Sequence, residues 1–265
     1  NTNEVVGLLG DNGAGKSTLM RIVCGILDQS YGKIWINGID TLDKREELQG
    51  QIGYLPQEFG MYEHMTASEF LDYQALLKGI IDNNLRKERI EKVLKAVHMF
   101  ERKDEQISSF SGGMKQRIGI AQILLNLPKI LVVDEPTAGL DPRERIRFRN
   151  MLVELSRDRI VLFSTHIIED ISSSCNKVIV INKGKVKYSG DPQEMAKLAD
   201  KHVFKFKIPV NEFDKLENKH MIVHHMRDGD DINVRFISKT KPFPTAENVT
   251  PLLEDAYLCL LKDIV

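Results

Sequence analysis

The 265-residue sequence predicts an α/β fold in which helices cover a parallel sheet. Short apolar, β-branched runs occur at 5–9, 130–134, 160–164 and 178–182, and such runs are typical of strands buried on both faces. Helical segments separate these runs, which favours a parallel sheet. A glycine-rich motif directly follows the first run and indicates a phosphate-binding loop at the end of a strand.

The composition is that of an ordinary globular protein, and it excludes some partners. Lys and Arg number 37 against 38 Asp and Glu, which gives a net charge of −1. A binder that relies on a broad basic field is therefore excluded, and we expect no nucleic-acid partner. The chain has no run of about 18 apolar residues, so we expect that it does not span a membrane by itself. Three widely spaced cysteines predict free thiols in a reducing compartment.

The chain opens almost directly on a strand. Only Asn1–Glu4 precede the apolar run at 5–9. A domain seldom begins on a central strand, so we expect further residues, including N-terminal strands, before Asn1 in the full-length protein.

Two local patterns organise the first part of the chain. Residues 32–38 alternate in polarity and end in Asn-Gly, which is typical of a hairpin at a sheet edge. The stretch at about 60–125 is helical in pattern, and Thr66 with Glu69 fits a capping box. One buried helix face is expected at the apolar positions Ile90, Val93, Leu94 and Val97. We expect a helical subdomain inserted in the α/β domain.

The pattern changes near residue 192, after Gly190-Asp191-Pro192. Strands are expected at 202–209, 220–226 and 231–238, and a closing helix at 251–264. The sequence thus predicts two domains, 1–192 and 193–265, of which the second has a small α+β fold.

Residues 10–17 read Gly-Asp-Asn-Gly-Ala-Gly-Lys-Ser and match the pattern G-x-x-x-x-G-K-[ST]. Glycines let successive backbone N–H groups point at phosphate oxygens, and a helix at about 17–24 directs its positive end at the same anion. Lys16 would add a charge at the β- and γ-phosphates, and the Ser17 hydroxyl is suited to Mg²⁺. The expected phosphate-loop ligands are Asn12, Gly13, Ala14, Gly15, Lys16, Ser17 and Thr18.

A second element is the strand that ends in two carboxylates, Asp134 and Glu135. The carboxyl edge of an open α/β sheet is where ligands gather. Asp134 is suited to hold Mg²⁺, and Glu135 is then placed to act as general base on an attacking water.

A third element, Ser111-Gly112-Gly113, precedes an apolar helical run that ends near Leu125. A hydroxyl and exposed N–H groups at a helix start make a second anion site, although a simple loop with a helix cap has the same pattern.

Residues 4 to about 192 resemble the nucleotide-binding domain of ATP-binding cassette (ABC) transporters. Six elements stand in the family's order: the phosphate loop at 10–17, Gln57 after the strand-like run 52–56, Ser111–Gly113, Asp134–Glu135, Ala138–Asp141 and His166. The resemblance implies a P-loop NTPase (RecA-like) core with a β edge subdomain and the helical insertion. It also implies an adenine-stacking aromatic residue, which would lie before Asn1.

The resemblance also implies roles for single residues. Gln57 resembles the glutamine that senses Mg²⁺ and the attacking water and links to the membrane partner. Ser111, Gly112 and Gly113 resemble the segment that closes over the γ-phosphate of the opposite subunit. Asp141 resembles the loop that couples the two sites, and Pro142 after it also suits a helix N-cap. His166 resembles the switch that contacts the γ-phosphate and positions Glu135.

By this resemblance the chain is an ATP-hydrolysing motor with ATP and Mg²⁺ as ligands. The resemblance implies that two cassettes, expected to be a homodimer, would sandwich two ATP and drive a separate polytopic permease from the cytoplasmic face of the membrane. Residues 248–258 resemble the C-terminal stretch of ABC-2-type exporter ATPases, and Met114 in place of a common Gln also occurs among exporter relatives. Export is therefore expected.

Two alternatives stay open. A non-transport ABC ATPase acting on DNA or the ribosome would share the core, but such proteins usually carry long coiled coils, zinc modules or two cassettes. Here Gln57 and Ser111 are only 54 positions apart. A GTPase or a small-molecule kinase would use the same phosphate loop. A GTPase needs an Asn-Lys-x-Asp base reader, and Asn182-Lys183 is followed by Gly and Lys.

Overall fold

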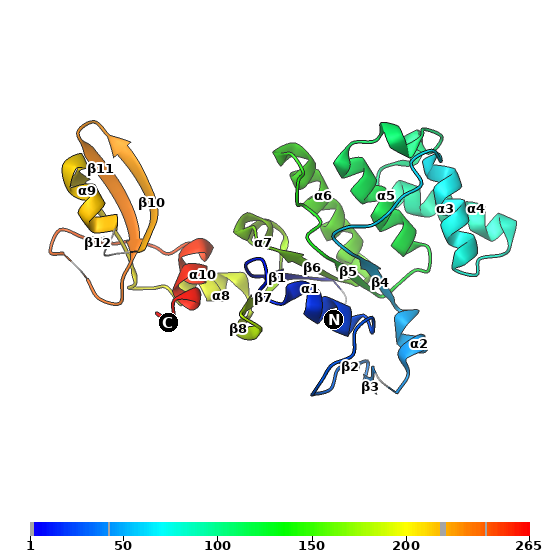
Figure 1. Ribbon diagram of the computed structural model, residues 1–265, viewed down its shortest axis with the longest axis horizontal. Coiled ribbons are helices and arrows are strands. Elements are labelled where there is room, and N and C mark those ends of the chain that lie inside the picture. The colour runs from blue at the N-terminus through cyan, green and yellow to red at the C-terminus, as the bar shows by residue number, and fades with distance from the viewer. Residues whose placement is uncertain (1–2, 42, 218–220, 242) are drawn as a thin grey trace. The chain divides into compact units, whose positions relative to one another are not determined.

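The computed structural model describes residues 3–41, 43–217, 221–241 and 243–265 (Figure 1). The chain divides into two compact units, residues 1–177 and 178–265. The expected boundary near residue 192 falls inside the second unit, because the segment before it forms a hairpin on which two helices of that unit pack.

The first unit is built on a parallel sheet, as the sequence predicts. Its strands lie in the order β4 (Ile52–Leu55), β5 (Ile130–Val133), β6 (Ile160–Thr165) and β1 (Glu4–Leu9). All three neighbouring pairs are parallel. The carboxyl ends of the strands therefore meet at one edge, and the segments that follow β1, β5 and β6 start from that edge.

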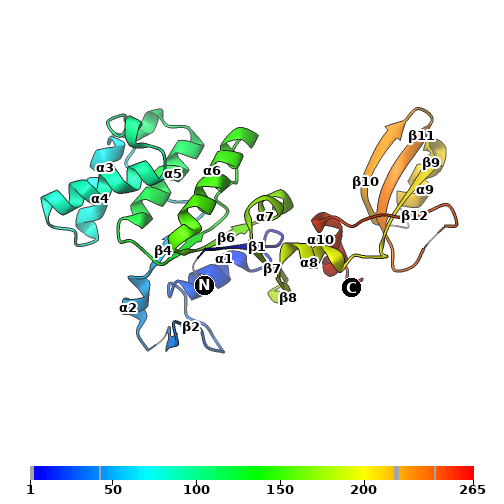
Figure 2. The same cartoon turned by 180° about the vertical axis from the view of Figure 1, so that it is seen from behind.

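Helices cover both faces of this sheet. Helix α1 (Lys16–Val23) lies on the opposite side from α6 (Pro142–Leu155) and α7 (Ile168–Ser174) (Figures 1 and 2). Asp141 caps α6 by accepting hydrogen bonds from the N–H groups of Arg143 and Glu144, both at 3.0 Å. With Pro142 at the first helical position, the predicted N-cap is confirmed. A short 3₁₀ turn, η3 (Ser156–Asp158), follows α6.

The helical insertion consists of α3 (Ala67–Leu77), α4 (Asn83–Ala96) and α5 (Gly112–Leu124). The 3₁₀ turns η1 (Phe100–Arg102) and η2 (Ile107–Ser109) connect α4 to α5. The predicted capping box is confirmed: the Thr66 hydroxyl accepts from the Glu69 N–H at 3.2 Å, and the Glu69 carboxylate accepts from the Thr66 N–H at 2.8 Å. The expected apolar face is also confirmed, because all four of its residues are buried: Ile90, Val93, Leu94 and Val97.

The predicted hairpin is formed by β2 (Trp35–Ile36) and β3 (Ile39–Asp40), which pair antiparallel. Asn37 and Gly38 form its turn with φ values of 52° and 78°, a conformation that glycine and asparagine adopt most readily. Helix α2 (Arg45–Gln49) follows.

The second unit begins with the antiparallel pair β7 (Lys177–Asn182) and β8 (Lys185–Gly190). Helices α8 (Pro192–Lys197) and α10 (Leu253–Leu261) pack against β8 and against each other. A partly buried ion pair joins α10 to the sheet of this unit, with Arg235 Nη2 2.6 Å from Asp255 Oδ2.

That sheet is antiparallel, with the order β10 (Met221–Asp228), β11 (Asp231–Ile237), β9 (Val203–Pro209) and β12 (Glu247–Asn248). Its three longer strands match the predicted segments 202–209, 220–226 and 231–238 to within two residues at each end. Residue 220 lies outside the described residues. Helix α9 (Val210–Glu217) is a finding that the sequence pattern did not predict. The core of this part contains Phe204, Phe206, Phe213, Ile232, Val234, Phe236 and Ala246.

Within the ranges that the structure describes, we find no helix that combines the length and the apolar character needed to cross a membrane.

The three cysteines are unbridged, and burial raises their thiol pKa values to about 12 for Cys24 and Cys175 and about 11 for Cys259. Because the thiolate is the nucleophile, the folded protein at pH 8 should react very slowly with a thiol reagent. Titration with Ellman's reagent should show three reactive thiols only after unfolding. One equivalent reacting at once in the native protein would contradict this prediction.

Candidate nucleotide-binding site

The loop after β1 has the backbone shape that the glycine pattern predicts. Gly13 and Gly15 have φ values of 79° and 106°, a region that residues with a side chain rarely enter. Helix α1 then begins at Lys16, and no side chain caps its N-terminus. Its first N–H groups and the positive end of its dipole are therefore available to an anion.

Lys16 is held inside this loop. Its side chain is buried, and Nζ donates to the carbonyl oxygens of Gly10 at 2.7 Å and Asp11 at 3.2 Å. The loop thus fixes the ammonium group at the base of a cavity of about 300 Å³. The cavity is lined by Asn12, Gly13, Gly15, Lys16, Ser17, Thr18, Gln57 and Glu135. Ala14, the remaining expected ligand of the loop, is buried and donates its N–H to Asp11 O at 3.1 Å.

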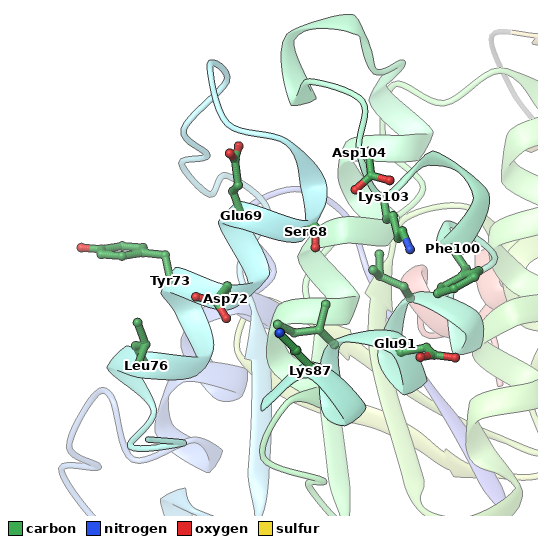
Figure 3. A pocket seen from close by; sticks show the side chains of 12 residues that line it. Ser68, Glu69, Asp72, Tyr73, Leu76, Lys87, Glu91, Phe100, Lys103 and Asp104 are labelled. Carbon is green, nitrogen blue, oxygen red and sulfur yellow. The ribbon is translucent and has the colours of Figure 1, made fainter. Parts of the chain in front are cut away.

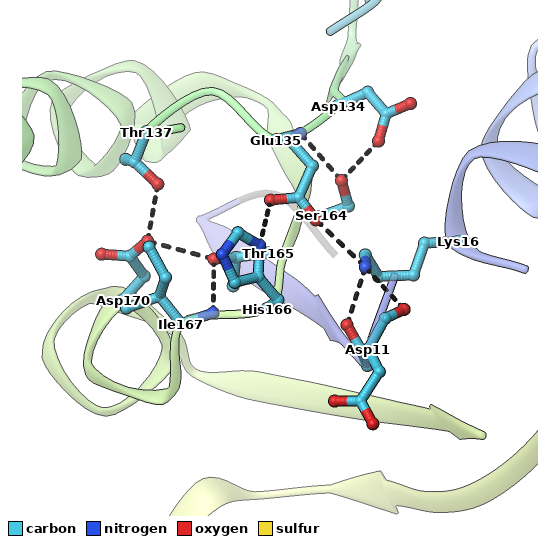
Figure 4. Close-up of polar contacts among 11 residues, drawn as sticks. Asp11, Lys16, Asp134, Glu135, Thr137, Ser164, Thr165, His166, Ile167 and Asp170 are labelled. Carbon is cyan, nitrogen blue, oxygen red and sulfur yellow. Dashed lines mark hydrogen bonds and ion pairs between the residues drawn. The ribbon is translucent and has the colours of Figure 1, made fainter. Parts of the chain in front are cut away.

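Glu135 lies between two basic side chains at the end of β5 (Figure 4). One carboxylate oxygen is 3.0 Å from Lys16 Nζ, and the other is 2.8 Å from His166 Nδ1. Glu135 is only 5% exposed, whereas the His166 side chain is 44% exposed and reaches toward solvent. The φ of Glu135 is 46°, in the left-handed region, which residues other than glycine seldom adopt. The residue that carries this carboxylate therefore has a strained backbone. The sheet thus brings together residues from the segments that follow β1, β5 and β6.

Ser164, the penultimate residue of β6, organises the two carboxylates and was not singled out by sequence reasoning. Its Oγ accepts a hydrogen bond from the Glu135 N–H at 2.8 Å and donates one to Asp134 Oδ1 at 2.5 Å. Asp134 and Ser164 are almost completely buried. The signal that could have identified Ser164 is the change from apolar to polar residues at the end of β6.

The side chains expected to hold a metal supply only oxygen donors. Ser17 and Gln57 line the phosphate cavity, and Asp134 directly follows the strand that ends beside it. A hydroxyl, an amide oxygen and a carboxylate form the hard donor set that Mg²⁺ prefers, so these residues fit that ion.

Ser111 and Gly113 are not among the residues that line the phosphate cavity. Ser111 caps α5, with its hydroxyl accepting from the Met114 N–H at 3.3 Å. A second cavity of about 310 Å³ is lined by both Gln57 and Gly112. Gln57 therefore borders both the phosphate cavity and the start of α5.

The segment after Gln57 also fits closely against α5. A Cβ atom placed on Gly119 would lie 2.7 Å from Cζ of the Phe59 ring. The ring therefore occupies space that exists because residue 119 carries no side chain.

A larger cavity, of about 640 Å³, lies within the helical insertion (Figure 3). Side chains of α3, including Asp72 and Tyr73, and of α4, including Lys87 and Glu91, line it. It shares no residue with the phosphate cavity.

Parallel strands, a glycine-rich phosphate loop and an acidic strand end together define a P-loop nucleoside triphosphatase. Comparison with known proteins narrows this class. The family model described as "ABC transporter" matches residues 1–138.

Two relatives and one solved structure illustrate the match. The uncharacterized ABC transporter ATP-binding protein YxlF of Bacillus subtilis is 39% identical over 219 residues, which is 83% of this chain and 72% of the relative. The probable multidrug ABC transporter ATP-binding protein YbhF of Escherichia coli is 31% identical over 272 residues, 97% of this chain and 47% of the relative. The structure of cbiO1 from Clostridium perfringens, part of the ABC transporter complex cbiONQ, has a TM-score of 0.68 at 30% identity and covers 73% of this chain and 79% of that one.

This chain belongs to the ABC transporter family. It is an ATP-binding subunit of that family, and such subunits are ATPases.

Replacing Lys16 by alanine removes the buried ammonium group from the base of the cavity. We expect ATP affinity to fall by about tenfold to a hundredfold, the usual value of a hydrogen bond to a charged group. Binding of a fluorescent ATP analogue would measure the change. Lys177→Ala, which removes an exposed lysine paired with Glu4, is the matched control. Unchanged affinity in Lys16→Ala would count against the assignment of the phosphate loop.

Proposed function

We propose that this chain is the motor of a membrane transporter and hydrolyses ATP with Glu135 as general base. The observation that carries the proposal is the position of the Glu135 carboxylate, between Lys16 Nζ at 3.0 Å and His166 Nδ1 at 2.8 Å. A carboxylate held at a phosphate cavity can accept a proton from a water molecule that attacks the γ-phosphate.

Most of the catalysis in this proposal is electrostatic. Lys16 and the first N–H groups of α1 face the charge that spreads over the transferring phosphoryl group. His166 contacts Glu135 and is partly exposed, so it can orient the carboxylate and reach toward the γ-phosphate. Backbone and side-chain contacts hold these groups before the nucleotide arrives, which lowers the cost of reorganisation.

Ser17, Asp134 and Gln57 would hold Mg²⁺. When bound, the ion would neutralise charge on the β- and γ-phosphates. Ser164 keeps the Asp134 carboxylate oriented at the sheet edge, since its hydroxyl donates to Oδ1.

We further propose that two copies of this chain form a head-to-tail dimer with two sandwiched ATP molecules. Ser111, Gly112 and Gly113 stand at the start of α5 and do not line the phosphate cavity of their own chain. An anion site at that helix start would be completed only against a nucleotide held by another cassette. Asp141, at the start of α6, would couple the two sites.

In this proposal the energy of ATP hydrolysis is passed to a separate polytopic permease, and this chain lies at the cytoplasmic face of the membrane. We propose that the helical insertion docks on it through Gln57 and the exposed apolar side chains of α3 and the loop after it. Leu77 and Ile81 are 64% and 80% exposed.

Export is the proposed direction. The stretch 248–258, Met114 and the relative named as a multidrug transporter subunit support it, and that relative aligns with both units of this chain. The relatives are named as subunits of ABC transporters, so an ATPase that acts on DNA or the ribosome is the less favoured alternative.

Glu135→Gln keeps the size of the side chain but removes the base. We expect ATP binding to persist, hydrolysis to fall by at least about a hundredfold, and an ATP-bound dimer to accumulate. Phosphate release and gel filtration with ATP would measure both effects. Glu88→Gln, an exposed substitution on α4, is the control. Hydrolysis near the wild-type rate in Glu135→Gln would remove Glu135 as the base.

Purification of the tagged chain in mild detergent from its native membranes should recover a stoichiometric polytopic membrane protein. Ile81→Asp should lose that protein, because a charge would be buried in the proposed contact. Val186→Asp, which changes a 59% exposed apolar side chain in the second unit, should retain it. Recovery of ribosomes or DNA-associated proteins instead would favour the alternative function.

A further inference from the structure

A buried carboxylate outside the phosphate cavity joins the two loops that carry Glu135 and His166. Asp170, on α7, has no exposed surface. Its Oδ2 accepts hydrogen bonds from the hydroxyl of Thr137 at 2.7 Å and from that of Thr165 at 3.1 Å (Figure 4). Thr137 lies two residues after Glu135, and Thr165 directly precedes His166.

The second of these contacts extends into the backbone around His166. The Thr165 hydroxyl, which donates to Asp170, accepts a hydrogen bond from the Ile167 N–H at 3.0 Å. His166 thus lies in a turn that is fixed on both sides. The Asp170 N–H in turn donates to Ile167 O at 3.1 Å, which closes the turn onto α7.

The negative charge is balanced from a third element. Arg149 on α6 is 5% exposed, and its Nη1 is 3.1 Å from Asp170 Oδ1. The same Nη1 donates to the carbonyl oxygen of Glu169 at 3.3 Å. A buried pair of this kind contributes little net stability but strongly disfavours arrangements that leave one charge unpaired. It therefore favours one relative position of α6, α7 and the two loops.

We propose that Asp170 is a positioning residue for ATP hydrolysis, which sets the distance between Glu135 and His166 by holding Thr137 and Thr165 with one carboxylate. This inference rests on the proposed roles of Glu135 and His166. It assigns a catalytic consequence to three buried side chains that do not line the phosphate cavity: Thr137, Arg149 and Asp170. Small misplacements of catalytic groups cost large factors in rate while leaving substrate binding intact.

Thr137→Val tests the proposal without removing a buried charge. Valine has the shape of threonine but cannot donate to Asp170. We expect kcat to fall about tenfold with the ATP dissociation constant within about twofold of wild type, and Thr137→Ser, which keeps the hydroxyl, to restore kcat. Ser156→Ala is the matched control, because it also removes a buried hydroxyl, one that donates to Val153 O at 2.7 Å away from the two loops.

A double substitution checks that Thr137 acts through Asp170. Asp170→Ala removes the oxygen that accepts from Thr137, together with the contacts to Thr165 and Arg149. It should therefore lower kcat at least as far as Thr137→Val, and adding Thr137→Val to it should cause little further loss, because the Thr137 contact is already absent. Thermal unfolding of each variant shows whether it is folded; if Asp170→Ala is not, the comparison of Thr137→Val with Thr137→Ser decides alone.

Two outcomes overturn the inference. One is an unchanged kcat in Thr137→Val; the other is an equal loss of kcat in Ser156→Ala, which would indicate a general effect of stability. Glu135→Gln separates this failure from that of the proposed function. If Glu135→Gln is inactive while Thr137→Val has full activity, only the positioning role fails. If Glu135→Gln hydrolyses ATP normally, the proposed general base fails as well.

Discussion

Parallel pairing of β1, β5 and β6 is the constraint on which the site depends. In this arrangement every strand ends at the same edge, so segments separated by more than a hundred residues start side by side. The phosphate loop follows β1, the two carboxylates follow β5, and His166 follows β6. The register adds precision, since Val133 is opposite Phe163 and Leu9 is opposite Thr165. A slip of one residue in either pair would turn alternate side chains to the other face.

The apolar strands therefore do more than form a core. Their burial fixes a platform, and short polar segments at its edge are held by hydrogen bonds between neighbouring loops. Ser164 links Asp134 to the backbone of Glu135, and Thr165 links the turn around His166 to α7. These hydroxyls lie at the end of β6, where the strand leaves the apolar interior. The polar groups of the site therefore lie where the strand sequence changes from apolar to polar residues.

Much of this could be predicted from the sequence because the signals are local. The phosphate loop needs a fixed spacing of glycines, the strand ends show as apolar runs followed by carboxylates, and Thr66 with Glu69 signals a helix start within four residues. The network around Asp170 could not be predicted in this way, because its members come from α6, α7 and two loops and meet only in the folded chain. Helix α9 was missed because it is short, and of its residues whose side chains are described only Phe213 is buried. The two compact units divide at residues 177 and 178, before the predicted boundary near residue 192. The sequence of β7 and β8 carries no signal for this, because the helices α8 and α10 that pack on the hairpin come later in the chain.

The fit of Phe59 against Gly119 has a consequence for how this protein can vary. A methyl group at position 119 would collide with the Phe59 ring, so a side chain is accommodated there only if residue 59 is smaller or displaced. The constraint runs in one direction, because residue 59 can become smaller while residue 119 stays glycine. Homologous chains that carry a side chain at position 119 should therefore have a smaller or displaced residue at position 59, two residues after Gln57.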